Sequence, residues 1–331
     1  MYKALLKYYI RRNSPSKAFG IVTDILAAVR KIPFGRHIVR MRYKNRIRTG
    51  RKLEIFGLEF ANPVGLAASI DTEGIFYNSL SDFGFSFIEI GPMSYVEQDY
   101  STPARHYLGV KKAIEHLRGD SPDCVIAANI TRNAQSRGSE IIRDFENAFA
   151  LLYDFVDMIV INPYCNGTEE PDEGNEDEGT GGTSELPDII DRILTMRLYY
   201  DVNKPVLVRL TPGIARAQAD EIVECCLSGG IDGIVAGSTL RRDDDSDGSE
   251  LFNKNLKFIH YIHEKSRGLL PIAGVGGIMN SARAQQMLDA GASLIEVYTG
   301  FFREGPSIVK DIVNNLPEAP DNSETGESES K

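Results

Sequence analysis

The chain has 331 residues, of which 42% are hydrophobic, and a net charge of −10 at pH 7. A chain of this length can bury roughly three quarters of its unfolded surface, so it needs no disulfide or metal to fold. Its four cysteines form no CxxC pair and histidine is scarce, which argues against a zinc site or a disulfide framework. We therefore expect no bound metal and a reducing, cytoplasmic environment.

No apolar run approaches the ~20 residues of a membrane span, so we exclude an integral membrane protein. The first residues, MYKALLKYYIRR, lack an apolar core followed by a small-residue cleavage site. They therefore do not predict a secretory signal.

The first region along the chain is a basic arm, residues 1–50. Residues 1–52 hold 15 lysines and arginines and a single acid, Asp24, whereas the rest of the chain is strongly acidic. The mixture of basic and helically spaced apolar residues predicts a small amphipathic helical subdomain on an anionic membrane surface. The alternative is an ordinary subdomain packed on the body with a solvated basic face. The helically spaced apolar residues of the arm are Ile21, Leu26, Val29, Ile38, Val39 and Met41. We expect no nucleic-acid partner for the arm.

Residues 51–316 alternate between predicted strands and predicted helices. Eight apolar or β-branched runs recur, which predicts a parallel sheet buried on both faces. Eight such units in ~240 residues predict a (β/α)8 TIM barrel. A doubly wound open sheet is the alternative, but no GxGxxG follows an early strand. The predicted strands are NPVGLAA (62–68), FIEIG (87–91), CVIAANI (124–130), MIVINP (158–163), PVLVRLT (205–211), DGIVAGS (232–238), PIAGVGG (271–277) and LIEVYTG (294–300).

Two segments lie outside this alternating pattern. Residues 168–188 carry nine acids and no base, and the tail, residues 317–331, is similarly acidic. Both segments are too polar to be buried, so we expect them to be disordered. The insertion at 168–188 follows the fourth predicted strand on the catalytic face. It is therefore either a lid or metal site, or a solvated insertion.

In a (β/α)8 barrel the site lies at the carboxyl ends of the strands. The seventh predicted strand ends in Gly276 and Gly277, and the eighth in Tyr298 and Thr299. Glycines let backbone N–H groups approach an anion, and the loops after strands seven and eight form the usual phosphate site of such barrels. These two ends therefore predict a phosphate site, with tight turns that hold no ligand as the alternative.

Polar residues stand at the ends of three other strands. Arg209 interrupts an apolar run, and a cation there suits an anion or an electron-rich cofactor ring. Asn129 and Asn162 could hydrogen-bond to a flat heterocycle. Cys165 follows on the loop over the site and is a candidate nucleophile or proton-transfer base, or an inert thiol. Cys225 and Cys226 lie in a helical pattern and are expected in the core.

Together these strand ends resemble those of dihydroorotate dehydrogenase, the FMN-dependent barrel enzyme of pyrimidine biosynthesis. The resemblance runs from about Met1 to Leu316. FGFSFIEIG and the run LPIAGVGGI…AGASLIEVYTGFFREGP are similar to family signatures nearly residue for residue. The arm followed by LEIFGLEFANPVGLAA resembles the membrane-associated, quinone-using class, in which a small helical subdomain guides quinone to the flavin.

The resemblance implies roles for individual residues. Cys165 would be the catalytic base, and Asn162 and Asn166 would hold the substrate. Arg209 stands where the family has a lysine beside the flavin. The implied FMN-binding residues are Ala67, Ala68, Asn129, Asn162, Arg209, Ser238, Gly276, Gly277, Tyr298 and Thr299.

The chain departs from the family at several positions. Thr72 replaces a lysine that touches flavin and substrate, and Gly237 replaces an asparagine. Cys165 stands where the quinone class has a serine base. The family's NRMGFNN segment is replaced by AIEHLRGDSP, in which Glu115 is nearest to the family's substrate-binding asparagine. Each buried polar partner that is lost costs about 1–3 kcal/mol of binding.

The resemblance implies oxidation of dihydroorotate to orotate with FMN, and a quinone as the electron acceptor. Cys165 would take the proton from C5 of the substrate. The implied location is the cytoplasm, with peripheral attachment to the inner face of the cell membrane. The departures leave a second interpretation open, an FMN-binding paralogue with a different substrate or with no catalytic activity.

Overall fold

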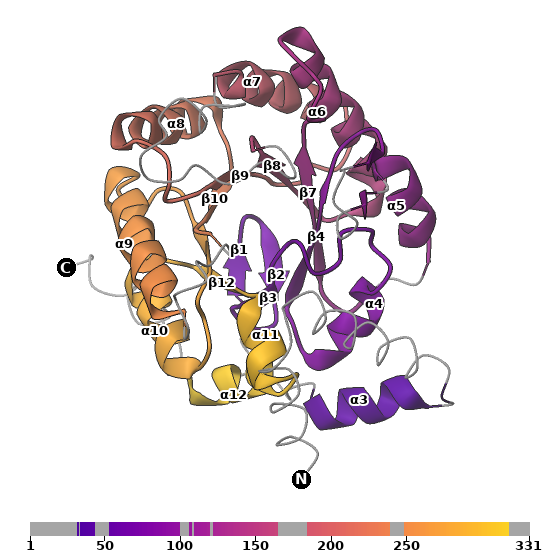
Figure 1. Cartoon of the computed structure of the whole chain (residues 1–331), viewed down its shortest axis with the longest axis vertical. Coiled ribbons are helices and arrows are strands. Elements are labelled where there is room, and N and C mark those ends of the chain that lie inside the picture. The colour runs from indigo at the N-terminus through magenta and orange to yellow at the C-terminus, as the bar shows by residue number, and fades with distance from the viewer. Residues whose placement is uncertain are drawn as a thin grey trace, which may run out of the picture.

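The computed structural model describes residues 32, 34–43, 53–99, 106–107, 109–119, 122–164, 184–238 and 248–317. Eight parallel strands close into a barrel that is surrounded by helices (Figure 1). Around the barrel the strands follow the order β3, β4, β7, β8, β9, β10, β11 and β12, and β12 pairs with β3 to close it. The predicted (β/α)8 barrel is confirmed.

Each barrel strand lies within, or overlaps, one of the eight predicted runs. The bounds are β3 (Val64–Leu66), β4 (Phe87–Met93), β7 (Val125–Thr131), β8 (Met158–Asn162), β9 (Val206–Leu210), β10 (Gly233–Ala236), β11 (Ile272–Val275) and β12 (Leu294–Val297). Two short antiparallel pairs lie outside the barrel: β1 (Leu53–Ile55) with β2 (Leu58–Phe60), and β5 (Gln98–Asp99) with β6 (His106–Tyr107).

The helices form the outer layer. Their apolar residues recur three and four positions apart, as in α6, where Ile141, Phe145 and Phe149 are buried. The elements are α3 (Gly35–Tyr43), α4 (Tyr77–Leu80), η1 (Ser81–Phe83), α5 (Gly109–Leu117), α6 (Ser139–Leu152), η2 (Tyr153–Phe155), α7 (Leu186–Arg197), α8 (Arg216–Gly229), α9 (Ser249–Lys265), α10 (Ser281–Asp289), α11 (Thr299–Glu304) and α12 (Ile308–Asn315).

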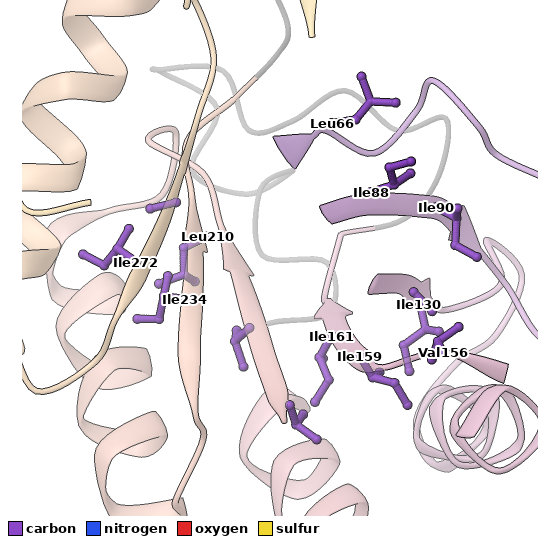
Figure 2. Packing of buried hydrophobic residues seen from close by; sticks show 14 of the residues in the cluster. Leu66, Ile88, Ile90, Ile130, Val156, Ile159, Ile161, Leu210, Ile234 and Ile272 are labelled. Atoms are coloured by element: carbon purple, nitrogen blue, oxygen red, sulfur yellow. The ribbon is translucent and has the colours of Figure 1, made fainter. Parts of the chain in front are cut away.

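Successive side chains of each strand point to opposite faces, and this divides the core in two. On β4, Ile88 and Ile90 belong to the layer between strands and helices, whereas Phe87 belongs to the barrel interior. Figure 2 shows the strand residues of the outer layer, among them Ile159 and Ile161 of β8. The apolar strands are therefore buried on both faces, as the continuous runs predicted.

The β1–β2 hairpin closes the amino-terminal end of the barrel (Figure 1). Phe60 of β2 packs edge-on against Phe87, with ring centroids 5.7 Å apart. Phe56, in the hairpin turn, approaches Gly233 at the start of β10 so closely that a Cβ there would lie 2.2 Å from its ring. This end of the barrel is filled by aromatic side chains.

Part of the basic arm is described, as helix α3, which lies outside the ring of barrel helices (Figure 1). Arg36 and Arg40 form ion pairs with the buried Asp82 of η1, and Tyr43 packs on Phe83. No helix in the described part of the chain has the length and hydropathy of a membrane span.

The two acidic segments fall mostly outside the described residues. The predicted insertion ends too late in the sequence, because residues 186–188 form the first turn of α7. Pro187 at the start of that helix and Asp188 in its first turn both favour a helix start there. Cys226 is buried in α8 as expected, but Cys225 is only half-buried.

Candidate functional site

The carboxyl ends of the barrel strands gather residues from all parts of the chain, and we call this end the mouth of the barrel. Every predicted site residue that the structure describes lies at or just beyond a strand end. These are Ala67 and Ala68 after β3, Asn129 in β7, Asn162 at the end of β8, Arg209 in β9, Ser238 after β10, Gly276 and Gly277 after β11, and Tyr298 and Thr299 after β12.

A row of amides crosses the mouth from β4 to β8. The Nδ2 group of Asn129 donates to Oε1 of Glu89 at 2.5 Å, and Oδ1 of Asn129 accepts from Nδ2 of Asn162 at 3.1 Å. Oδ1 of Asn162 in turn accepts the backbone N–H of Tyr164 at 3.2 Å. Because each amide uses both a donor and an acceptor, the orientation of both side chains is fixed.

Several buried polar atoms at the mouth have no hydrogen-bond partner among the described residues. They are Nη1 of Arg209, Oγ1 of Thr211, Oε2 of Glu89 and Oε2 of Glu296. A buried polar group without a partner costs about 1–3 kcal/mol, so such groups are rare away from functional sites. Nη1 of Arg209 and Oγ1 of Thr211 are therefore candidates to bind a polar ligand there.

The loop after β11 is built around close backbone approaches. A Cβ on Gly276 would lie 2.0 Å from the backbone oxygen of Ser238, and the residue has φ +104°. Asn255 of α9 holds Ser238 in place, because its side chain accepts the N–H of Ser238 and donates to its C=O, both at 2.9 Å. Only glycine fits at position 276, and the loops after β10 and β11 are fixed together.

The loops after β11 and β12 also touch. A Cβ on Gly300 would lie 2.2 Å from the backbone oxygen of Ile278. Gly277 has φ +75° and packs directly against Phe252. The two loops that the sequence assigned to a phosphate site are therefore adjacent and shaped by glycine.

The loop after β3 is held by a buried carboxylate. Asp71 accepts the backbone N–H groups of Ile75 at 2.9 Å and Phe76 at 2.8 Å. Burial raises the pKa of Asp71 to about 6, although these hydrogen bonds act in the opposite direction. Ser69 adopts φ +74°, a conformation that glycine favours.

Cys165 and Asn166, the predicted base and one predicted substrate ligand, lie outside the described residues. Burial raises the pKa of the Cys226 thiol far above its usual range, so that cysteine is unreactive. In the described part of the chain, no three side chains of the types that ligate metals come together.

Three residues that shape the mouth were missed from the sequence: Glu89, Glu296 and Asn255. Glu89 and Glu296 each interrupt an apolar strand, which is the signal that identified Arg209. Asn255 carries no such signal, because its role depends on α9 packing beside the ends of β10 and β11.

Comparison with known proteins bears on what the mouth binds. The sequence model described as dihydroorotate dehydrogenase matches residues 106–319. The chain belongs to the dihydroorotate dehydrogenase family. It is 28% identical to the dihydroorotate dehydrogenase (quinone) of Christiangramia forsetii, over 96% of this chain and 99% of the relative. The corresponding protein of Coxiella burnetii is 28% identical over 79% of this chain and 83% of the relative.

Solved structures agree on the fold. The ligand-free type DHODH from Eimeria tenella superposes with a TM-score of 0.76 at 20% identity, covering 91% of this chain and 93% of that one. Enzymes of the dihydroorotate dehydrogenase family use FMN as cofactor. The unpartnered polar atoms and the glycine-shaped loops at the mouth fit such a group.

One departure from the family pattern is built into the backbone. Gly237 has φ +122°, and a Cβ at this position would lie 2.2 Å from the backbone oxygen of Val275. The asparagine that the sequence resemblance implies at this position does not fit this conformation. Glu115 is exposed on α5 and Thr72 is half-buried in the loop after β3.

Proposed function

We propose that this chain oxidises dihydroorotate to orotate with FMN and passes the electrons to a quinone. The observation that carries the proposal is the match along almost the whole chain to relatives named dihydroorotate dehydrogenase (quinone). The mouth of the barrel supports it, because its buried polar groups suit a flavin and a planar anion.

In this proposal the mouth binds both the phosphate and the ring system of FMN. The loops of Gly276 and Gly277, with Tyr298, Thr299 and Ser238, hold the phosphate through backbone N–H groups. Ala67 and Ala68 leave room for the ring system beside β3. The side chains that hydrogen-bond the ring are Asn129, Asn162 and Arg209.

The chemistry divides between cofactor and chain. Bound FMN supplies a hydride acceptor at the mouth. Asn162 and Asn166 orient the substrate, and Cys165 takes the proton from its C5 atom as a general base. Arg209 supplies a positive charge for an anionic partner.

We also propose that residues 1–50 form a membrane-facing arm that admits the quinone, ahead of a barrel of residues 51–316 and an acidic tail. Phe34, just before α3, is 81% exposed, and Ile38 and Met41 in the helix are 61% and 73% exposed. Arg36 and Arg40 of the same helix bind Asp82. An exposed apolar face on a basic helix favours peripheral attachment to an anionic membrane, here the inner face of the cell membrane.

Liposome flotation tests the arm. Ile38→Asp should reduce binding to anionic vesicles, because it places a charge in the apolar face of α3. Leu198→Asp, at an exposed position after α7, should not. Equal binding of both variants would contradict a membrane role for α3.

A second function is favoured by one observation. Gly237 and Thr72 remove polar groups that the family uses, and the backbone at Gly237 has no room for a side chain. A flavoprotein of the same family that acts on a different substrate would show these changes.

Steady-state kinetics separate the two functions. The purified protein should reduce a soluble quinone analogue in the presence of dihydroorotate. Cys165→Ala should reduce kcat by about 10²–10⁴-fold, the usual contribution of a general base. Cys225→Ala, which alters a half-buried thiol on α8, is the matched control and should leave kcat unchanged. A protein that holds FMN but shows no dihydroorotate-dependent rate would favour the second function.

A further inference from the structure

Two carboxyl groups meet inside the barrel, below the amide row. Glu89 of β4 and Glu296 of β12 are both fully buried. Their strands flank β3, where Glu296 lies beside Gly65 in the strand register. Both side chains face the barrel interior, and each has one carboxyl oxygen, Oε2, without a hydrogen-bond partner among the described residues. Because Ala67, just after the intervening strand, carries only a methyl group, the two carboxyl groups lie close enough to interact.

The surroundings of the pair carry one positive charge. Arg209 of β9 is the charged group that attracts Glu296, and β7 contributes the neutral amide of Asn129 to Glu89. Glu89 and Arg209 are thus the ionisable groups that act most strongly on Glu296. Two ionised carboxylates in contact and without solvent repel strongly. Burial raises the pKa of Glu296 well above its usual range, and the neighbouring Glu89 raises it further.

We propose that Glu89 and Glu296 share one proton at neutral pH, and that Glu296 is a positioning residue whose neutral acid holds Glu89 as the acceptor for Asn129. The proposal rests on the flavin-binding part of the proposed function and not on the substrate. It assigns a role to two residues below the flavin site.

The shared proton controls two properties of the mouth. It sets the direction of the row that runs from Glu89 through Asn129 and Asn162 to the backbone of Tyr164, immediately before Cys165. It also sets the charge, because the singly protonated pair carries one negative charge that Arg209 balances. Loss of the proton would leave the mouth net negative and weaken the binding of FMN, an anion, at high pH.

Infrared spectroscopy of the FMN-loaded full chain tests the shared proton directly. The wild-type protein at pH 7–8 should show the C=O stretching band of a buried protonated carboxylic acid. Glu296→Gln should abolish this band, because the amide replaces the neutral acid. Absence of the band from the wild-type protein, or its persistence in Glu296→Gln, would overturn the proposal.

The pH dependence of FMN affinity tests the positioning role. Between pH 7 and 9 the affinity of the wild-type protein should fall by up to about tenfold for each pH unit above the point where the proton is lost. Glu296→Gln should bind FMN within about twofold of wild type at pH 7 and should lose this pH dependence. The exposed Glu221→Gln is the matched control and should follow wild type. Parallel pH profiles for wild type and Glu296→Gln would contradict the role. Neither readout uses dihydroorotate, so a failure here is distinct from a failure of the proposed substrate.

Discussion

The two ends of the barrel are lined by side chains of opposite polarity. At the amino-terminal end, Phe56, Phe60 and Phe87 pack edge to face under the β1–β2 hairpin, with ring centroids 5.7–6.4 Å apart. At the mouth, carboxyl, amide and guanidinium groups are buried to the same degree but leave polar atoms without partners. Burial stabilises the first end and is costly at the second, so stability and ligand binding are separated along one axis.

This separation predicts that substitutions at the amino-terminal end change stability alone. Phe87→Ala removes a fully buried ring that lies over Gly65, and should lower the free energy of unfolding by about 3–5 kcal/mol. Urea denaturation measures this, and the affinity for FMN should stay within about twofold of wild type. Tyr199→Ala, at a position that is 84% exposed, is the control and should change stability by less than about 0.5 kcal/mol. A large loss of FMN affinity in Phe87→Ala would break the separation.

At the mouth, the buried Asp71 makes stability depend on pH. Its pKa, about 6 in the folded chain, lies above its ordinary value of 3.8, so the folded state binds the extra proton. The stabilisation from this proton is complete below pH 4 and is lost as the pH rises through 6. From pH 4 to 7, Asp71→Asn should gain stability relative to wild type by about 3 kcal/mol, because asparagine does not titrate. Unfolding curves at pH 4, 5, 6 and 7 measure the change, and parallel curves for the two proteins would show that Asp71 is not responsible.

A matched pair of glycines sharpens the comparison. Gly276→Ala, at the mouth, forces a Cβ to within 2.0 Å of Ser238, which should cost about 1–3 kcal/mol and weaken FMN binding by about 10–100-fold. Gly57→Ala, in the hairpin at the other end, also has positive φ but meets no atom within 4 Å. It should leave FMN binding unchanged. Fluorescence titration with FMN measures both, and equal losses would contradict a cofactor site at the mouth.

A matched pair of asparagines gives the smallest effect. Asn129→Leu removes the hydrogen bonds to Glu89 and Asn162, whereas Asn62→Leu removes hydrogen bonds to Gly84 and Val64 at the amino-terminal end. Each should lower stability by about 1–3 kcal/mol. Only Asn129→Leu should also weaken FMN binding, and a loss of affinity in Asn62→Leu would argue against the division.

Much of this arrangement could be predicted from the sequence. The barrel followed from eight continuous apolar runs, because strands buried on both faces cannot alternate with polar residues. Asn129, Asn162 and Arg209 were identified because a polar residue inside such a run must point to a site. Glu89 and Glu296 carry the same signal and were passed over.

Other features depend on tertiary contacts that no local pattern records. Asn255 lies on α9, and its side chain can hydrogen-bond to Ser238 only because that helix packs beside the end of β10. The proximity of Glu89 and Glu296 arises because their strands flank β3 and both side chains face the barrel interior. The Gly237 backbone conformation was likewise visible only once the neighbouring β11 was in place.

The most direct test of the central claim is an anaerobic reduction of the purified full chain. The protein should be yellow with bound FMN, and dihydroorotate added without oxygen should bleach the visible flavin band. A yellow protein that bleaches with dithionite but not with dihydroorotate would contradict the proposed substrate. A colourless protein that cannot be reconstituted with FMN would contradict the assignment of the mouth as a flavin site.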